Sequence, residues 1–235
     1  MPCLRRGTSF VALFDDWIRR LKKMGKEVER KRVGIVLFED IEVLDFCGPF
    51  EVFSVTRLNE EKRREEPSPF EVWLVAEHQG PVTASGNMKV LPHYTFENCP
   101  PLHILVVPGG GGTRKELSNK VMLEWLRTRA AEVETLTSVC TGSMLLGFAG
   151  LLSGLHATTH WRSLEWMRDS FPKVSVESEK HVVEDGRVLT SAGISAGIDM
   201  ALKVVARTFG EPVARATARH MEYPYPDSNE RRIRL

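Results

Sequence analysis

The sequence lacks the features that mark several broad classes of protein. Lys and Arg number 32 against 31 Asp and Glu, a formal net charge of +1, so nothing electrostatic favours nucleic acid or an anionic membrane as partner. No apolar run reaches the roughly 20 residues that a membrane-spanning helix needs. The four cysteines are widely spaced, without a CxxC pair or a zinc-ligand spacing. We therefore expect a cytoplasmic protein that acts on a small molecule and needs no metal or other cofactor.

Residues 1–31 differ in pattern from the rest of the chain. Their apolar side chains recur at intervals of three and four residues, which predicts an amphipathic helix. The residues concerned are Phe10, Leu13, Phe14, Trp17, Ile18, Leu21 and Met24. Asp15 and Asp16 interrupt the basic face of this helix, which argues against a membrane-surface helix and against a secretory signal. We expect an N-terminal extension over 1–31, docked on the main domain or on a second subunit.

From residue 32 onward, short apolar runs alternate with segments of helical pattern. Hydrophobic residues make up 42% of the chain, enough for a sizeable core. Continuous apolar runs of this kind are typical of strands buried on both faces of a parallel sheet. The predicted strands are 32–38, 70–76, 103–107 and 136–139. Residues 32–235 are therefore expected to form one α/β domain, a sandwich around a mostly parallel sheet.

Other local signals place the connections between these strands. Pro49 is expected in the first turn of a helix, and Asn119 is expected to cap another. The polar stretch 59–69 is expected to be a surface loop. The remaining predictions are a hairpin over 82–92, a tight turn at Asp185-Gly186 and two closing helices over 194–209 and 211–221.

Cys140 stands in the most informative segment, Ser138-Val-Cys-Thr-Gly-Ser143. A strand here meets a turn of small residues that opens a helix. Such an elbow holds a nucleophile clear of the sheet, where open α/β sheets bind ligands. A helix N-terminus also favours the thiolate. An inert buried thiol is the commoner fate of cysteine, but the small neighbours Thr141 and Gly142 favour a reactive one.

A glycine-rich segment follows the preceding strand, beginning with Gly109 and Gly110. Consecutive glycines let backbone N–H groups approach an anion or a developing negative charge. Taken alone, the segment reads as a flexible turn, and no phosphate-binding motif accompanies it. Its position one strand away from Cys140 makes it a candidate oxyanion site.

Asp45 follows the first strand between the apolar residues Leu44 and Phe46. A carboxyl group in apolar surroundings has a raised pKa, which suits it to proton transfer. An ordinary helix cap before Pro49 explains the same residue equally well.

Two further residues are weaker candidates. His160 could act as a base for Cys140, although a structural histidine is the more common role. Ile194, in a run of small and apolar residues, could face a pocket, although core packing explains it equally simply.

Five ordered segments together resemble the motifs of the DJ-1/PfpI superfamily, and within it most those of the isocyanide (isonitrile) hydratases. They are Asp45-Phe-Cys-Gly-Pro, Pro108-Gly-Gly, Ser138-Val-Cys-Thr-Gly-Ser, Ala157-Thr-Thr-His-Trp and Ala192-Gly-Ile-Ser-Ala-Gly-Ile-Asp. The likeness covers Val33 to Tyr223. It implies a flavodoxin-like three-layer sandwich, similar to class I glutamine amidotransferases, which usually forms a homodimer and carries a cysteine nucleophile elbow.

The resemblance also implies roles for the site residues. An acid from the loop after the first strand lies beside the cysteine: it is glutamate in most of the superfamily and aspartate in the hydratase-like group, as at Asp45. Protease-like members have histidine directly after the cysteine, whereas this chain has Thr141, which disfavours peptide hydrolysis. In a hydratase, Cys140 would attack the isocyanide carbon and Asp45 would transfer protons. Gly110 and Thr141 would orient the intermediate, and Ile194 would receive the organic group.

Two alternative functions share the same cysteine. One is a DJ-1-like glyoxalase that converts methylglyoxal to lactate. The other is a redox or ligand sensor without turnover. Similar domains form the N-terminal half of AraC-type regulators, but those need a helix-turn-helix domain after the sandwich. This chain ends at Leu235 and is nearly neutral, so we expect no DNA-binding role.

Overall fold

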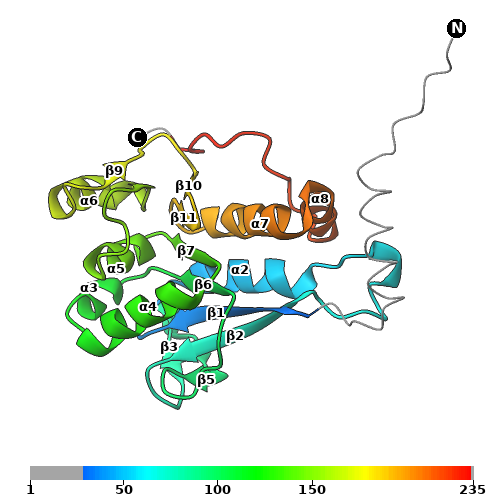
Figure 1. Ribbon diagram of the computed structural model, residues 1–235, viewed down its shortest axis with the longest axis horizontal. Helices are drawn as coiled ribbons and strands as arrows, with labels where there is room; N and C mark the ends of the chain where they lie inside the picture. Colours follow the sequence, from blue (N-terminus) through cyan, green and yellow to red (C-terminus); the bar gives the residue numbers. More distant parts are fainter. Residues whose placement is uncertain (1–28, 234–235) are drawn as a thin grey trace, which may run out of the picture. The chain divides into compact units, whose positions relative to one another are not determined.

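The computed structural model describes residues 29–233 (Figure 1). The chain divides into two units, Met1–Arg30 and Lys31–Leu235, and the fold described below is that of the second. The helix predicted from the apolar pattern of residues 10–24 lies outside the described residues and stays a prediction.

A seven-stranded sheet forms the centre of the domain, in the order β10-β11-β7-β6-β1-β2-β5. Its pairs are parallel except for the antiparallel hairpin of β10 and β11 at one edge. Its strands are β1 (Lys31–Leu37), β2 (Phe70–Ala76), β5 (Tyr94–Thr95), β6 (Ile104–Val107), β7 (Thr135–Val139), β10 (Val182–Asp185) and β11 (Val188–Ser191). The predicted mostly parallel sheet is confirmed.

The strand order reverses between β1 and β6. From β1 the chain crosses to β2 on one side, and β6 then returns to the other side of β1. Open α/β sheets bind ligands beyond the carboxyl ends of the strands at such a reversal. The fold therefore directs attention to the loops that follow β1, β6 and β7.

Helices cover both faces of the sheet and complete three layers (Figure 1). The crossovers β1-α2-β2 and β6-α4-β7 run in opposite directions, so right-handed connections place α2 and α4 on opposite faces. Helices α7 and α8 pack with α2, whereas α3 and α5 pack with each other and α5 with α4. The helices are α2 (Val43–Val55), α3 (Thr113–Glu116), α4 (Lys120–Glu132), α5 (Gly142–Phe148), α6 (Leu164–Ser170), α7 (Ala196–Phe209) and α8 (Glu211–His220). Among these described helices, none has the length and apolarity to cross a membrane.

Several local predictions hold. The Asn119 side chain accepts hydrogen bonds from the N–H groups of Val121 and Met122 and so caps α4. The predicted hairpin is present as β3 (Val82–Thr83) paired with β4 (Lys89–Val90). No local pattern predicted α6 or β9 (Ser175–Val176). Strand β9 pairs with β8 (His156–Ala157) in a separate two-stranded sheet.

The start of α2 differs from the prediction. The helix begins at Val43, so Pro49 lies inside it rather than in its first turn. An internal proline removes one helical hydrogen bond and is normally unfavourable. Here tertiary packing outweighs that cost: Phe46 and Val52 are buried, and Gly48 lies against Ile198 of α7. As a result, Asp45 stands in the first turn of a helix.

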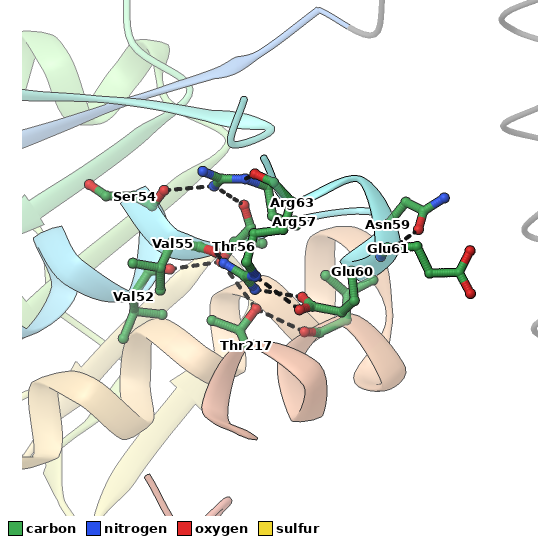
Figure 2. Close-up of polar contacts among 11 residues, drawn as sticks. Val52, Ser54, Val55, Thr56, Arg57, Asn59, Glu60, Glu61, Arg63 and Thr217 are labelled. Atoms are coloured by element: carbon green, nitrogen blue, oxygen red, sulfur yellow. Dashed lines mark hydrogen bonds and ion pairs between the residues drawn. The ribbon is translucent and has the colours of Figure 1, made fainter. Parts of the chain in front are cut away.

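The polar stretch 59–69 is a largely exposed connection, as predicted, with one short 3-10 turn, η1 (Glu60–Lys62). Arg57 and Arg63 join it to the end of α2 (Figure 2), and the Arg57 Nε donates to the Arg63 carbonyl oxygen at 3.2 Å. Arg57 donates to the carbonyl oxygens of Ser54 and Thr56 at 2.9 and 2.8 Å. Arg63 donates to that of Val55 at 2.5 Å. These bonds satisfy carbonyl groups that a helix end leaves without intrahelical partners.

We expect the Arg63→Ala variant to lose about 1–2 kcal/mol of unfolding free energy, because the charge-assisted bond to Val55 in the last turn of α2 and the ion pair with Glu60 both disappear. Urea unfolding of the whole protein measures this loss. Arg64→Ala is the matched control, since no hydrogen bond or ion pair of Arg64 appears among the described residues. An equal loss in both variants would contradict the capping role of Arg63.

Candidate active site

Four parallel strands bring the candidate residues to one edge of the sheet. Asp45 follows β1, Gly109 follows β6, Cys140 follows β7 and Ile194 follows β11. These strands are neighbours in the sheet and run in the same direction. The carboxyl ends of the strands therefore gather residues that lie as many as 149 positions apart, counted from Asp45 to Ile194.

Cys140 occupies the predicted elbow between β7 and α5. Its φ angle of 56° lies in the left-handed region, a conformation that costs a residue with a side chain on the order of 1–3 kcal/mol. The surrounding hydrogen bonds hold it there. The Cys140 N–H points to the carbonyl oxygens of Ser191 and Ala192, at 3.2 and 3.1 Å. The Cys140 carbonyl accepts hydrogen bonds from the hydroxyls of Ser143 and Thr159, at 3.1 and 3.0 Å.

Asp45 is fully buried and aimed at the elbow. Its Oδ2 accepts a hydrogen bond from the Gly109 N–H at 2.9 Å. Its Oδ1 has no hydrogen-bond partner of its own within the described part of the chain, and the Cys140 thiol is a neighbour that interacts with this carboxyl group. Burial raises the pKa of Asp45 to about 8, and the nearby charge of Glu42 adds to the increase.

Burial also raises the pKa of the Cys140 thiol, and the charge of Asp45 raises it further. The N–H groups of Thr141 and Ile194 and the Thr141 hydroxyl oppose this rise by hydrogen bonding to the sulfur. The helix α5 that begins beside Cys140 has only seven residues, and Cys140 is buried, with 6% of its surface exposed. The prediction that the helix N-terminus favours the thiolate is wrong for the net balance, because burial and the charge of Asp45 outweigh the N–H groups of Thr141 and Ile194. At neutral pH, the pair formed by Cys140 and Asp45 holds at least one proton.

The glycine-rich segment serves the site differently from the prediction. The Gly109 N–H is bound to Asp45, and the Gly110 N–H donates to Thr141 Oγ1 at 3.1 Å. Both groups thus have partners inside the protein and are not aimed at an oxyanion. A Cβ on Gly109 would lie 2.5 Å from both the backbone nitrogen and Oγ1 of Thr141, so only glycine permits this approach.

Thr141 links the two loops. Its hydroxyl oxygen lies 2.9 Å from the hydroxyl oxygen of Thr113, in addition to its bond from Gly110, and it interacts with the Cys140 sulfur. Thr113 was not singled out from the sequence, because nothing in its local pattern connects it to a residue 28 positions away. Thr159, which bonds the Cys140 carbonyl, was also missed as an individual residue, although it lies in one of the five resembling segments.

Two apolar side chains lie near the reactive pair and are partly open to solvent. Ile194 and Leu44 are each 37% exposed. Ile194 has a φ of 50° and presents its N–H to the sulfur. Leu44 is adjacent to Asp45, and both it and Ile198 lie close to Gly48. Both residues are therefore candidates to contact an apolar group bound at Cys140.

His160 has a structural role. Its Nδ1 accepts a hydrogen bond from the Arg162 N–H at 3.3 Å and caps the short turn η3 (Trp161–Ser163). Its ring packs against Gly193, where a Cβ would lie 2.2 Å from Cδ2. Burial and the charges of Arg162 and Arg231 lower its pKa. No hydrogen bond joins it to Cys140 or Asp45 among the described residues, so the common structural role fits better than that of a base for Cys140.

Comparisons with known proteins agree with this architecture. Residues 31–207 match the DJ-1/PfpI family. Over 193 residues the chain is 36% identical to an isonitrile hydratase of Pseudomonas putida, covering 82% of this chain and 78% of the relative. A crystal structure of a ThiJ/PfpI family protein from Pseudomonas syringae superimposes with a TM-score of 0.73 at 30% identity, covering 85% of this chain and 78% of that one.

A second kind of relative matches this chain over only part of its own length. The HTH-type transcriptional regulator GbdR of Pseudomonas aeruginosa is 30% identical over 142 residues, which make up 60% of this chain and 38% of the regulator. The relatives of this chain therefore include both an enzyme and a regulator that is much longer than the shared region. On the extent of the match and the level of identity, this chain belongs to the DJ-1/PfpI family.

Proposed function

We propose that the protein is an isocyanide hydratase, which adds water to an organic isocyanide and yields an N-substituted formamide. The observation that supports this most is the buried pair formed by Cys140 and Asp45, a nucleophile and a proton carrier in contact. The 36% identity to an isonitrile hydratase adds support.

The first step starts from the pair with one proton, carried by Asp45, and the Cys140 sulfur attacks the terminal isocyanide carbon as the thiolate. The sulfur forms a bond to that carbon, and the proton held by the pair moves to the same carbon through Asp45. The product is a covalent thioimidate, in which the carbon is bonded to nitrogen, hydrogen and sulfur. A carboxyl group whose pKa is about 8 suits this step because it still holds its proton near neutral pH.

The second step hydrolyses the thioimidate. Asp45, now ionised, accepts a proton from a water molecule as its oxygen attacks the carbon. Asp45 passes this proton to the nitrogen. The carbon–sulfur bond then breaks, the sulfur leaves with the electron pair, and the hydroxyl proton of the adduct returns to Asp45. The formamide is released, and one proton remains on the pair of Cys140 and Asp45. One water molecule is consumed, so the overall addition balances.

The organic substituent lies against Ile194 and Leu44, the partly exposed apolar side chains beside the pair. The Thr141 hydroxyl, held by Gly110 and Thr113, orients the reacting group. Gly109 and Gly110 support the site indirectly, by fixing Asp45 and Thr141. Binding of the substrate then depends on apolar contact with its organic substituent. No metal ion or organic cofactor takes part in either chemical step.

The test compares two substrates on the purified full-length chain. With n-butyl isocyanide we expect stoichiometric N-butylformamide, followed by the formyl proton in NMR spectra. With methylglyoxal we expect at least about tenfold lower kcat/KM for lactate formation. Lactate without formamide would replace the proposal with a glyoxalase. Turnover of neither substrate, with dose-dependent oxidation of Cys140 to the sulfinate, would replace it with a sensor.

The homodimer implied by the family resemblance and the cytoplasmic location expected from the few, widely spaced cysteines stay proposals. Sedimentation equilibrium of the purified chain tests the first, because a dimer doubles the mass of a 26.5 kDa chain.

A further inference from the structure

The segment that follows α8 lies beyond the family match, which ends at residue 207, yet it is fastened next to the candidate site. It returns towards β9 and β10 (Figure 1). Asn229 accepts through its carbonyl oxygen from the His181 N–H at 2.8 Å and exchanges two side-chain bonds with Val182. The Arg231 N–H donates to the Glu179 carbonyl at 2.7 Å. We call residues 229–232 the C-terminal strap.

Arg231 reaches from this strap to three oxygen atoms. Its Nε donates to the Ser178 carbonyl at 2.6 Å. Its Nη2 donates to the Thr158 hydroxyl at 2.8 Å and to the Thr159 carbonyl at 3.2 Å. The planar guanidinium has donors in a fixed fork that fits several acceptors at once. Arg231 therefore sets the position of the segment formed by Thr158 and Thr159.

Thr159 connects that segment to the cysteine elbow. It is fully buried, and its hydroxyl donates to the Cys140 carbonyl at 3.0 Å. A shift of Thr159 would therefore pull on the backbone of Cys140, which already has an unfavourable φ of 56°. The charge that acts on the thiol is that of Asp45, so Arg231 acts through geometry rather than through its own charge.

Arg232 holds the opposite side of the elbow. It forms an ion pair with Asp199 at 2.6 Å, and it donates to the Tyr223 hydroxyl, which in turn donates to Asp199. Asp199 lies in the first turn of α7, directly after the turn whose Ile194 N–H points at the sulfur. Arg231 thus binds the segment that contains Thr159, and Arg232 binds the first turn of α7, on the two sides of Cys140.

We propose that Arg231 is a positioning residue of the candidate active site, which aligns Cys140 through the hydroxyl of Thr159. The proposal assumes the reactive thiol of the proposed function, but it does not depend on isocyanide as substrate. Its readout is therefore chosen to need no turnover.

The experiment measures the rate at which iodoacetamide alkylates Cys140 at pH 7, followed by mass spectrometry of the peptide that contains it. We expect Arg231→Ala to react about tenfold more slowly, because a displaced elbow loses the N–H and hydroxyl bonds that favour the thiolate. Arg168→Ala is the matched control: it removes an arginine paired with the exposed Glu165 on α6 and should react at the wild-type rate. An unchanged or faster rate in Arg231→Ala would overturn the proposal.

A double-variant cycle separates positioning from general support of the fold. Thr159→Val removes the hydroxyl with little change in shape and should also slow alkylation about tenfold, whereas Thr159→Ser should not. If Arg231 acts through Thr159, the double variant stays near tenfold. Independent effects would multiply to about a hundredfold and would overturn the proposal.

If Arg231→Ala does not fold, Arg231→Lys replaces it in both measurements. A lysine can reach one of the three acceptors, so we expect a rate about threefold below that of the wild type. A wild-type rate in this variant would count against the proposal. Absence of formamide production together with slowed alkylation would remove the proposed function and leave the positioning role standing.

Discussion

The Cys140→Ala variant is expected to lose formamide production by a factor on the order of 10³ or more in kcat/KM, because the step that forms the carbon–sulfur bond has no substitute. The change removes one sulfur atom from a site that is 6% exposed. The hydrogen bonds that shape the elbow involve its backbone, so the fold should persist. NMR of the formyl proton and circular dichroism measure the two effects.

A second cysteine provides the matched control. Cys47 lies on α2, two residues from Asp45, and burial raises the pKa of its thiol. Within residues 29–233 no polar partner is found that would stabilise a thiolate at Cys47, so Cys47→Ala should retain activity within about twofold. Rapid mixing with n-butyl isocyanide should also show a transient mass increase of one substrate on the wild type and none on Cys140→Ala. Wild-type turnover in Cys140→Ala would eliminate the covalent mechanism.

The sequence predicted the architecture because its information is local and repeated. Apolar runs of four to seven residues, separated by helical segments, are sufficient to indicate a parallel sheet. The start of α2 could not be found in this way. The local cost of Pro49 argues for a helix that begins there, whereas contacts with α7, about 150 positions later in the chain, make the longer helix stable.

The site was predicted in part for the same reason. Cys140 and Asp45 stand beside strand ends, which the sequence reveals, and the structure brings them together. The hydrogen bonds of the Gly109 and Gly110 N–H groups to Asp45 and Thr141 could not be predicted, because they depend on the exact distance between two loops. The balance between burial and hydrogen bonding at Cys140 depends on how deeply the elbow is covered. The contact of Arg231 with the site could not be predicted from the sequence, because its partner Thr158 lies 73 residues away along the chain.

Asp45→Asn is the change expected to have the second largest effect on activity, a loss of about 10²–10⁴-fold in kcat, the usual contribution of a positioned acid and base. The asparagine oxygen can still accept the Gly109 N–H, so the loop should keep its place. What disappears is the group that delivers a proton to the isocyanide carbon and later takes one from water. Asp45→Glu is the control, because it keeps a carboxyl group, and it should retain more activity than Asp45→Asn.

Relative to the wild type, the Asp45→Asn variant should become more stable as the pH rises. In the folded protein, the Asp45 carboxyl holds its proton up to a pKa of about 8, against 3.8 for the unperturbed group. Between these values unfolding releases a proton, so the stability of the wild type falls with increasing pH. Asparagine has no such proton, and urea unfolding at pH 5 and pH 8 should show the difference in favour of Asp45→Asn growing. A constant difference would mean that Asp45 is ionised in the folded state, and an ionised Asp45 could not supply the proton that the first step requires.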